Sequence, residues 1–90
     1  MTEVLAATGD AHVLAYRRTF DELEIEIETW DEELRVVRAR GVVVLHDIGT
    51  WECDGVVRFP ELDDGDLRGY AIVNTEDVAT LTFNARELVL

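Results

Sequence analysis

Residues 22–28 read Glu-Leu-Glu-Ile-Glu-Ile-Glu, and this stretch decides the fold class. Side chains of a β-strand point alternately to its two faces, so Leu23, Ile25 and Ile27 share one face and the glutamates share the other. A helix, with its period of about 3.6 residues, would scatter these apolar side chains around its circumference. The stretch therefore predicts a half-buried strand with an acidic outer face.

The segments on either side of this strand also favour β structure. Strands are expected over residues 11–20, 34–47, 51–59, 70–73 and 78–83, which are rich in β-branched and aromatic residues and separated by turn signals. A short helical turn is expected near the N-terminus, from Thr2 to Ala7. The prediction is mainly β: one domain over residues 1–90, folded as a single antiparallel curled sheet or a small open barrel.

Turn residues predict where these strands end. A two-residue turn at Asp21-Glu22 would place Phe20 opposite Leu23. Gly41 lies inside a valine-rich segment, which predicts a bulge, a bend or a break between two strands. The continuous run Val42–Leu45 is expected to be buried on both faces, and Asp54-Gly55 is expected to form a hairpin turn.

The composition limits the class of partner. The chain has 20 acidic residues and 8 basic ones, all arginine, which gives a formal net charge of -12. This charge argues against nucleic acid or an anionic membrane surface as the main partner, and it favours a basic protein. The absence of lysine also fits a coding bias, so the acidic excess has a genomic interpretation beside the functional one.

Cysteine usage and hydropathy bear on the compartment. Cys53 is the single cysteine, so no intramolecular disulfide is expected. The first residues, from Met1 to Ala7, lack the basic start and long apolar run of a secretory signal. No apolar run approaches the roughly 20 residues that a membrane-spanning helix needs. These features predict a cytoplasmic protein.

The densest charge in the sequence surrounds the deciding strand and suggests a docking surface for a basic protein. The candidate partner-binding residues are Glu24, Glu26, Glu28, Trp30, Asp31, Glu32 and Glu33. The alternative is a solvated strand face that Arg17, Arg38 and Arg40 partly neutralise. Trp30 is expected either to pack at the core or its rim, or to act as an exposed interface anchor.

The residues with catalytic or metal-binding side chains form no recognisable motif. His12, His46, Asp10, Asp47 and Cys53 lack the paired spacing of a metal site, and Cys53 has no base beside it in the sequence. The histidines are expected to be buried. Asp63-Asp64-Gly65-Asp66 lacks the closing glutamate of a calcium loop, because Ala71 stands in its place, and it predicts a turn. We expect no enzyme activity, no metal and no cofactor.

Two further segments are notable: Gly9-Asp10-Ala11-His12-Val13, and the aliphatic stretch from Val42 to Ile48, which follows an early β-hairpin. In this order they resemble small bacterial immunity proteins. The likeness covers about half the chain. It implies an inhibitor that caps a toxin or an enzyme by surface complementarity and performs no chemistry of its own.

The sequence thus leads to three hypotheses. The first is a non-enzymatic acidic domain that docks on a basic protein partner and inhibits or regulates it. The second is a structural module that forms a homodimer through exposed sheet edges. The third is a barrel that binds a small ligand or a metal through His12, His46 and Cys53.

Overall fold

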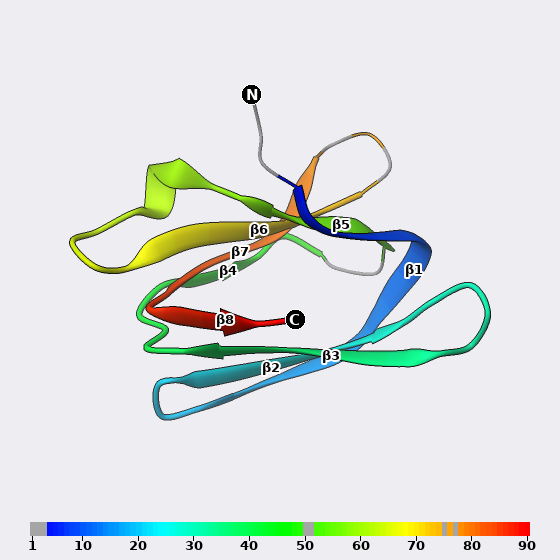
Figure 1. The fold of residues 1–90 in the computed structure, drawn as a ribbon, viewed down its shortest axis with the longest axis horizontal. Helices are drawn as coiled ribbons and strands as arrows, with labels where there is room; N and C mark the ends of the chain where they lie inside the picture. Colours follow the sequence, from blue (N-terminus) through cyan, green and yellow to red (C-terminus); the bar gives the residue numbers. More distant parts are fainter. Residues whose placement is uncertain (1–3, 50–51, 75, 77) are drawn as a thin grey trace.

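In the computed structural model, which describes residues 4–49, 52–74, 76 and 78–90, the chain is mainly β. The strands are β1 (Val4–Thr19), β2 (Glu22–Glu28), β3 (Leu34–Arg40), β4 (Leu45–Asp47), β5 (Glu52–Arg58), β6 (Arg68–Val73), β7 (Ala79–Ala85) and β8 (Glu87–Val89), with a short 3-10 helix η1 (Pro60–Leu62) between β5 and β6. Among the described residues they form one antiparallel sheet in the order β4-β7-β6-β5-β1-β2-β3-β8 (Figure 1). The sheet is curled and not closed into a barrel, which confirms the first of the two predicted architectures.

The deciding strand has the predicted conformation. In β2, the side chains of Leu23, Ile25 and Ile27 are fully buried, and the glutamates between them face outward. They pack with Val56, Ile72, Leu81 and Phe83 from the other half of the sheet. Because the sheet curls, its inner face encloses this core from both halves.

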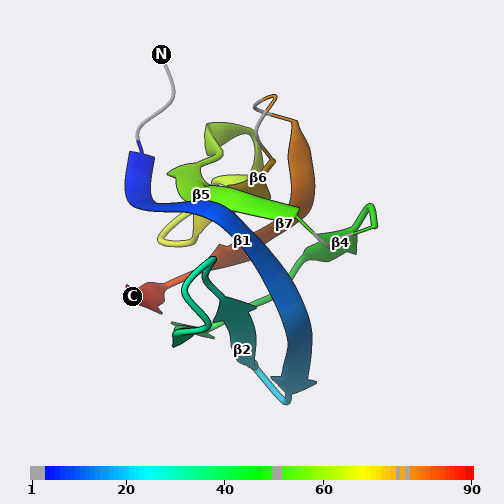
Figure 2. The ribbon, with the colours of Figure 1, turned by 90° about the vertical axis from the view of Figure 1, so that its right-hand side faces the viewer.

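The curl depends on β1, which is long enough to belong to both halves of the sheet. Its first part pairs with β5 and its second part with β2 (Figure 2). The register of β1 shifts near Gly9, which has φ +53°, and again at Leu14. Such irregularities bend a strand and increase its twist. The predicted helical turn at residues 2–7 is therefore wrong for its described part, because β1 already begins at Val4.

The two ends of the curled sheet meet through the last strands. Arg86 separates β7 from β8, and its N–H donates to the carbonyl of Arg40 on β3 (2.8 Å). Gly41 follows with φ +77°, and a Cβ there would lie 2.6 Å from Arg86 Nε. Asn84 Oδ1 accepts the N–H groups of Val43 and Val44 (3.0 and 2.9 Å). Gly41 thus marks a break between β3 and β4, one of the predicted alternatives.

The β1–β2 turn differs from its prediction. The turn residues are Phe20 and Asp21, so Arg18 rather than Phe20 stands opposite Leu23. Phe20 has φ +53° and is 98% exposed. The shift is by two residues, which keeps the side chains between this turn and the bulge at Leu14 on their predicted faces. The inward-facing guanidinium of Arg18 finds acceptors in the carbonyls of residues 42 and 43 (3.1 and 3.2 Å).

Two other local predictions are wrong. The run Val42–Leu45 is not buried on both faces: Val42 is buried, but Val43 is 61% exposed. Asp54 and Gly55 form no hairpin; they lie inside β5, where Gly55 pairs with strands on both sides. Tertiary pairing overrides the local turn preference there, because Gly55 occupies the centre of a sheet and its backbone groups are used in the ladder.

Candidate functional site

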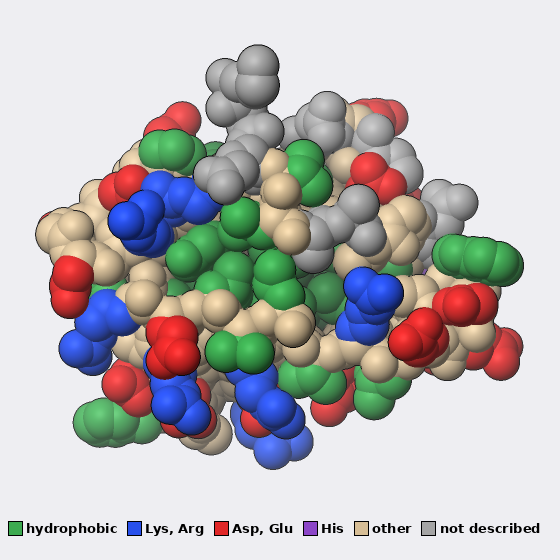
Figure 3. Space-filling model, in the orientation of Figure 1, with side chains coloured by type: hydrophobic (Ala, Val, Ile, Leu, Met, Phe, Trp, Pro, Cys, Tyr) green, Lys and Arg blue, Asp and Glu red, His purple; other side chains and the backbone are tan. Residues whose placement is uncertain are grey.

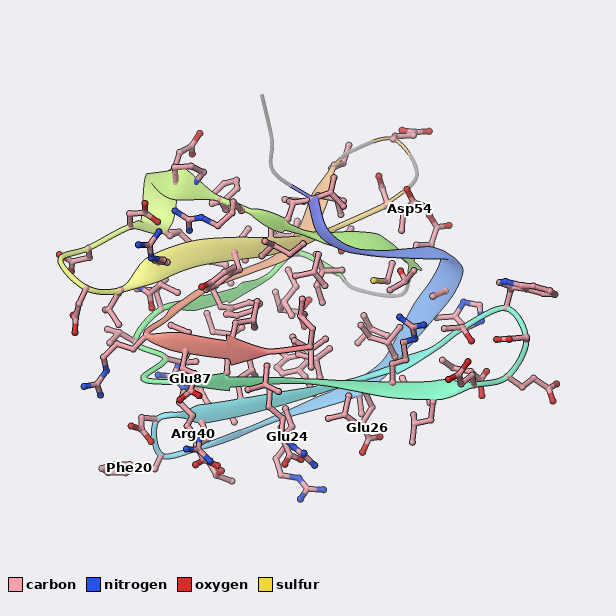
Figure 4. The ribbon with its side chains drawn as sticks, viewed as in Figure 1. Phe20, Glu24, Glu26, Arg40, Asp54 and Glu87 are labelled. Carbon is pink, nitrogen blue, oxygen red and sulfur yellow. The ribbon has the colours of Figure 1, made fainter. Side chains whose placement is uncertain are left out.

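The outer face of β1, β2 and β3 carries the predicted acidic strip, and its first half is neutralised. Glu22 lies opposite Arg40, with 3.7 Å between Oε1 and Nε. Glu24 lies between Arg17 and Arg38, and its Oε1 is 3.4 Å from Arg38 Nε. Figure 4 shows Glu24 and Glu26 projecting to the same side of β2. This half of the strip fits the alternative prediction of a solvated, arginine-paired face.

The second half of the strip has no such partners. Glu26 lies between Ala15 and Val36, and Glu28 lies between His12 and Leu34. Within the described part of the chain, neither glutamate forms an ion pair. Their carboxylates are therefore free to interact with another molecule.

The β2–β3 turn continues this charge and holds it in a fixed shape. Thr29 is buried, and its N–H donates to the Glu33 carbonyl (2.9 Å). Its hydroxyl donates to Asp31 Oδ1 and accepts the N–H of Glu33 (3.2 Å). At the tip, the Trp30 side chain is 77% exposed. The expectation that Trp30 packs at the core is wrong, and it stands beside the acids as an exposed aromatic group.

Together these residues define what we call the acidic end: Glu26, Glu28, Trp30, Asp31, Glu32 and Glu33. The other end of the same face holds Arg17, Arg38 and Arg40, interleaved with Glu22 and Glu24. Figure 3 shows acidic and hydrophobic side chains gathered around the β2–β3 turn, whereas arginines are more frequent toward the opposite side. The two ends of one face thus differ in charge.

The turn also controls the ionisation of one member of the acidic end. The hydrogen bond from Thr29 lowers the pKa of Asp31 below its ordinary value, with smaller contributions from backbone N–H groups and Arg35. A lowered pKa stabilises the folded protein above the ordinary pKa, and that stability is lost as the pH falls through the folded-state pKa. Asp31 therefore stays charged under mildly acidic conditions.

We expect the substitution Thr29→Val to raise the pKa of Asp31 toward its ordinary value of 3.8, because valine keeps the shape but lacks the hydroxyl donor. The acid dependence of stability below that pH should become weaker. Titration of the Asp31 carboxyl carbon by NMR measures the shift. Asp63 serves as the control, since its pKa is lowered by Arg58 at a distant position and should not change. An unaltered Asp31 pKa would contradict this role of Thr29.

The predicted metal and nucleophile candidates are not brought together. His12 and His46 are exposed, which corrects the expectation that they are buried, because the bulges in β1 turn His12 toward Glu28 and Glu52. Cys53 is buried, and burial raises the pKa of its thiol. Among the described residues, no group of three or more histidine, cysteine, aspartate or glutamate side chains is placed to hold a metal ion. The Asp10 side chain and Trp51 lie outside the described part of the structure.

A cavity of about 470 Å³ opens on the outer face of the other half of the sheet. It is lined by the apolar residues Val57, Phe59, Val73 and Ala79 and by the charged residues Arg58 and Glu61. Arg58 binds Asp63 through both of its terminal nitrogens (3.1 and 2.9 Å) and donates to the Gly69 carbonyl (2.6 Å). Asp63 therefore closes a loop, as predicted for residues 63–66. The cavity includes none of His12, His46 and Cys53.

No protein-family model, curated protein or solved structure matches the chain. The resemblance to immunity proteins therefore stays a prediction. The described residues include no helix that is long and apolar enough to cross a membrane. The function has to be argued from the geometry of the site itself.

Proposed function

We propose that this protein is a non-enzymatic acidic binding domain that docks on a basic protein and inhibits or regulates it, in the manner of an immunity protein. The observation that carries the proposal is the unequal neutralisation of one strand face. Arginines pair with Glu22 and Glu24, while Glu26 and Glu28 have none opposite. Glu24 thus lies at the border of the proposed contact surface, and the acidic end forms its centre.

Charge and shape both support this surface. The acidic end holds five carboxyl groups, and the nearby guanidinium of Arg35 offsets only part of their charge. Such a local field accelerates association with a basic partner and selects against acidic ones. Trp30 offers a large rigid side chain of the type that dominates binding energy at interfaces. The hydrogen bonds of Thr29 fix the turn before binding, which lowers the entropy lost on association.

A matched pair of double variants tests where binding occurs. Glu26→Gln with Glu28→Gln and Glu22→Gln with Glu24→Gln each remove two charges from the same face of β2. We expect the first pair to weaken binding of an oligoarginine peptide about tenfold, because it removes unpaired carboxylates. The second pair should change the affinity by about twofold or less, because its carboxylates already interact with arginines.

Isothermal titration at low salt measures both dissociation constants, and an oligoglutamate peptide is the negative control. NMR titration with the oligoarginine peptide should move the amide signals of residues 26–33 most. If the two double variants weaken binding equally, attraction follows net charge alone and the proposed site is wrong.

A cytoplasmic location belongs to the same proposal and rests on Cys53, which has no cysteine to pair with inside the chain.

A further inference from the structure

The strand next to the acidic strip has an unused hydrogen-bonding edge. β8 covers only the end of β3, where it pairs with Arg38, Ala39 and Arg40. Within the described part of the chain, no strand pairs with residues 34–37 on that side, which we call the free edge of β3. An uncovered edge offers backbone donors and acceptors to another strand. Leu34, at its start, is 57% exposed.

Two hydrogen bonds determine which backbone groups face this free edge. The N–H of Thr29 donates to the Glu33 carbonyl, so the backbone carbonyl of Glu33 faces β2. The N–H of Arg86 donates to the Arg40 carbonyl from the opposite side. Backbone N–H and C=O groups alternate in direction along a strand, so those of the even-numbered residues of β3 face away from β2. The N–H and C=O groups of Leu34 and Val36 therefore face the free edge.

The side chains beside the free edge indicate what a partner strand should carry. On the outer face, Val36 lies next to Glu26 and Leu34 lies next to Glu28. An added strand would run about 4.8 Å from β3 and about 9.6 Å from β2. Arginine stems on that strand would cover Val36 and Leu34, and their guanidinium groups would reach the glutamates. On the inner face, the added strand would approach the buried Val37, which favours apolar residues.

We infer that the basic partner binds as an extended segment of alternating basic and apolar residues, which adds antiparallel to the free edge of β3 in line with β8. This inference rests on the proposed function and specifies how the partner is held. Backbone hydrogen bonds to Leu34 and Val36 fix the segment. Its basic side chains contact Glu26 and Glu28. A second copy of this chain fits less well, because each copy carries a net charge of -12.

Backbone methylation provides the direct test, with a short peptide that alternates arginine and valine as the probe. In an antiparallel arrangement with arginines on the outer face, the arginine N–H groups point to Val36 and Leu34, and the valine N–H groups point away. N-methylation of the arginines should therefore weaken binding about tenfold or more. N-methylation of the valines should change the affinity by about twofold or less. If both methylated peptides bind as tightly as the parent, the free edge is not used.

The experiments distinguish a failure of the proposed function from a failure of the edge-pairing inference. If oligoarginine binds at the acidic end but backbone methylation has no effect, the proposed function stands and edge pairing is wrong. If none of the arginine-containing peptides binds, both proposals are wrong.

A variant of the protein itself provides the second test. Val36→Pro removes the N–H that faces the free edge, and proline is tolerated on sheet edges. Val36→Thr keeps that N–H and is the matched control. Affinity for the unmethylated peptide should fall about tenfold in the first variant and remain within about twofold in the second. Thermal unfolding establishes that both variants fold. If Val36→Pro does not fold, the methylated peptides still show whether the free edge of β3 is used in binding.

Light scattering of the protein alone tests whether a second copy of the chain occupies the free edge of β3. A concentration-independent monomer is expected. A dimer that dissociates in the Val36→Pro variant would assign the free edge to a second copy and overturn the inference.

Discussion

Replacement of Ile25 by alanine is expected to destabilise the protein by about 2–5 kcal/mol, the range found when a large aliphatic side chain is removed from a packed core. Ile25 is fully buried at the centre of β2, between Tyr16 on β1 and Val37 on β3. A domain of this size is stabilised by only about 5–13 kcal/mol, so this single change removes a large part of the total. Urea denaturation should show a lower midpoint with an unchanged slope.

The adjacent position on the same strand supplies the control. Glu26 faces outward, and Glu26→Ala should change stability by about 0.5 kcal/mol or less. The same substitution should weaken binding of the oligoarginine peptide. The substitution at Ile25 is thus expected to affect stability, and the substitution at Glu26 is expected to affect binding. Equal loss of stability at both positions would contradict the assignment of the two faces.

Gly69→Ala is expected to have an effect of similar size, about 3 kcal/mol or more, for a different reason. Gly69 is buried at the start of β6, and an added Cβ would lie 1.9 Å from the Phe59 carbonyl oxygen and 2.9 Å from Leu62 Cβ. Its backbone is also fully engaged, since its carbonyl accepts from Phe59 and Arg58 and its N–H donates to Asp63. The chain cannot move away without breaking these bonds.

Gly65 is the matched control for this substitution. It lies in the loop just before β6 with φ +61°, and a Cβ there would contact nothing within 4 Å. Gly65→Asn should therefore cost about 0.5 kcal/mol or less, because asparagine tolerates this left-handed conformation. Thermal unfolding of both variants measures the difference. If Gly69→Ala unfolds at the temperature of the parent protein, the close approach of Gly69 and Phe59 is wrong.

Several features of the site could be read from the sequence because they are local. The alternation from Glu22 to Glu28 places alternate residues on opposite faces, whatever the partner strands are. The break at Gly41 is also local, since a positive φ there suits glycine. The acidic candidates were found for the same reason, as a run of charges along one strand and its turn.

Other features of the site depend on register, which no local pattern specifies here. The position of the β1–β2 turn decides that Ala15, and not Arg17, stands opposite Glu26, and the bulge at Leu14 then places His12 opposite Glu28. The free edge of β3 had no signal in the sequence, because it exists only where β8 stops short of Leu34. The exposure of Trp30 likewise depends on the hydrogen bonds that Thr29 forms around the turn.

The sequence by itself determined that this protein is a β-sheet with an acidic strand face, because side-chain direction alternates along a strand irrespective of its neighbours. The tertiary structure alone decided which glutamates are neutralised and which edge is open. Cross-strand neighbours are distant in sequence, and one bulged residue in β1 changes every pairing beyond it.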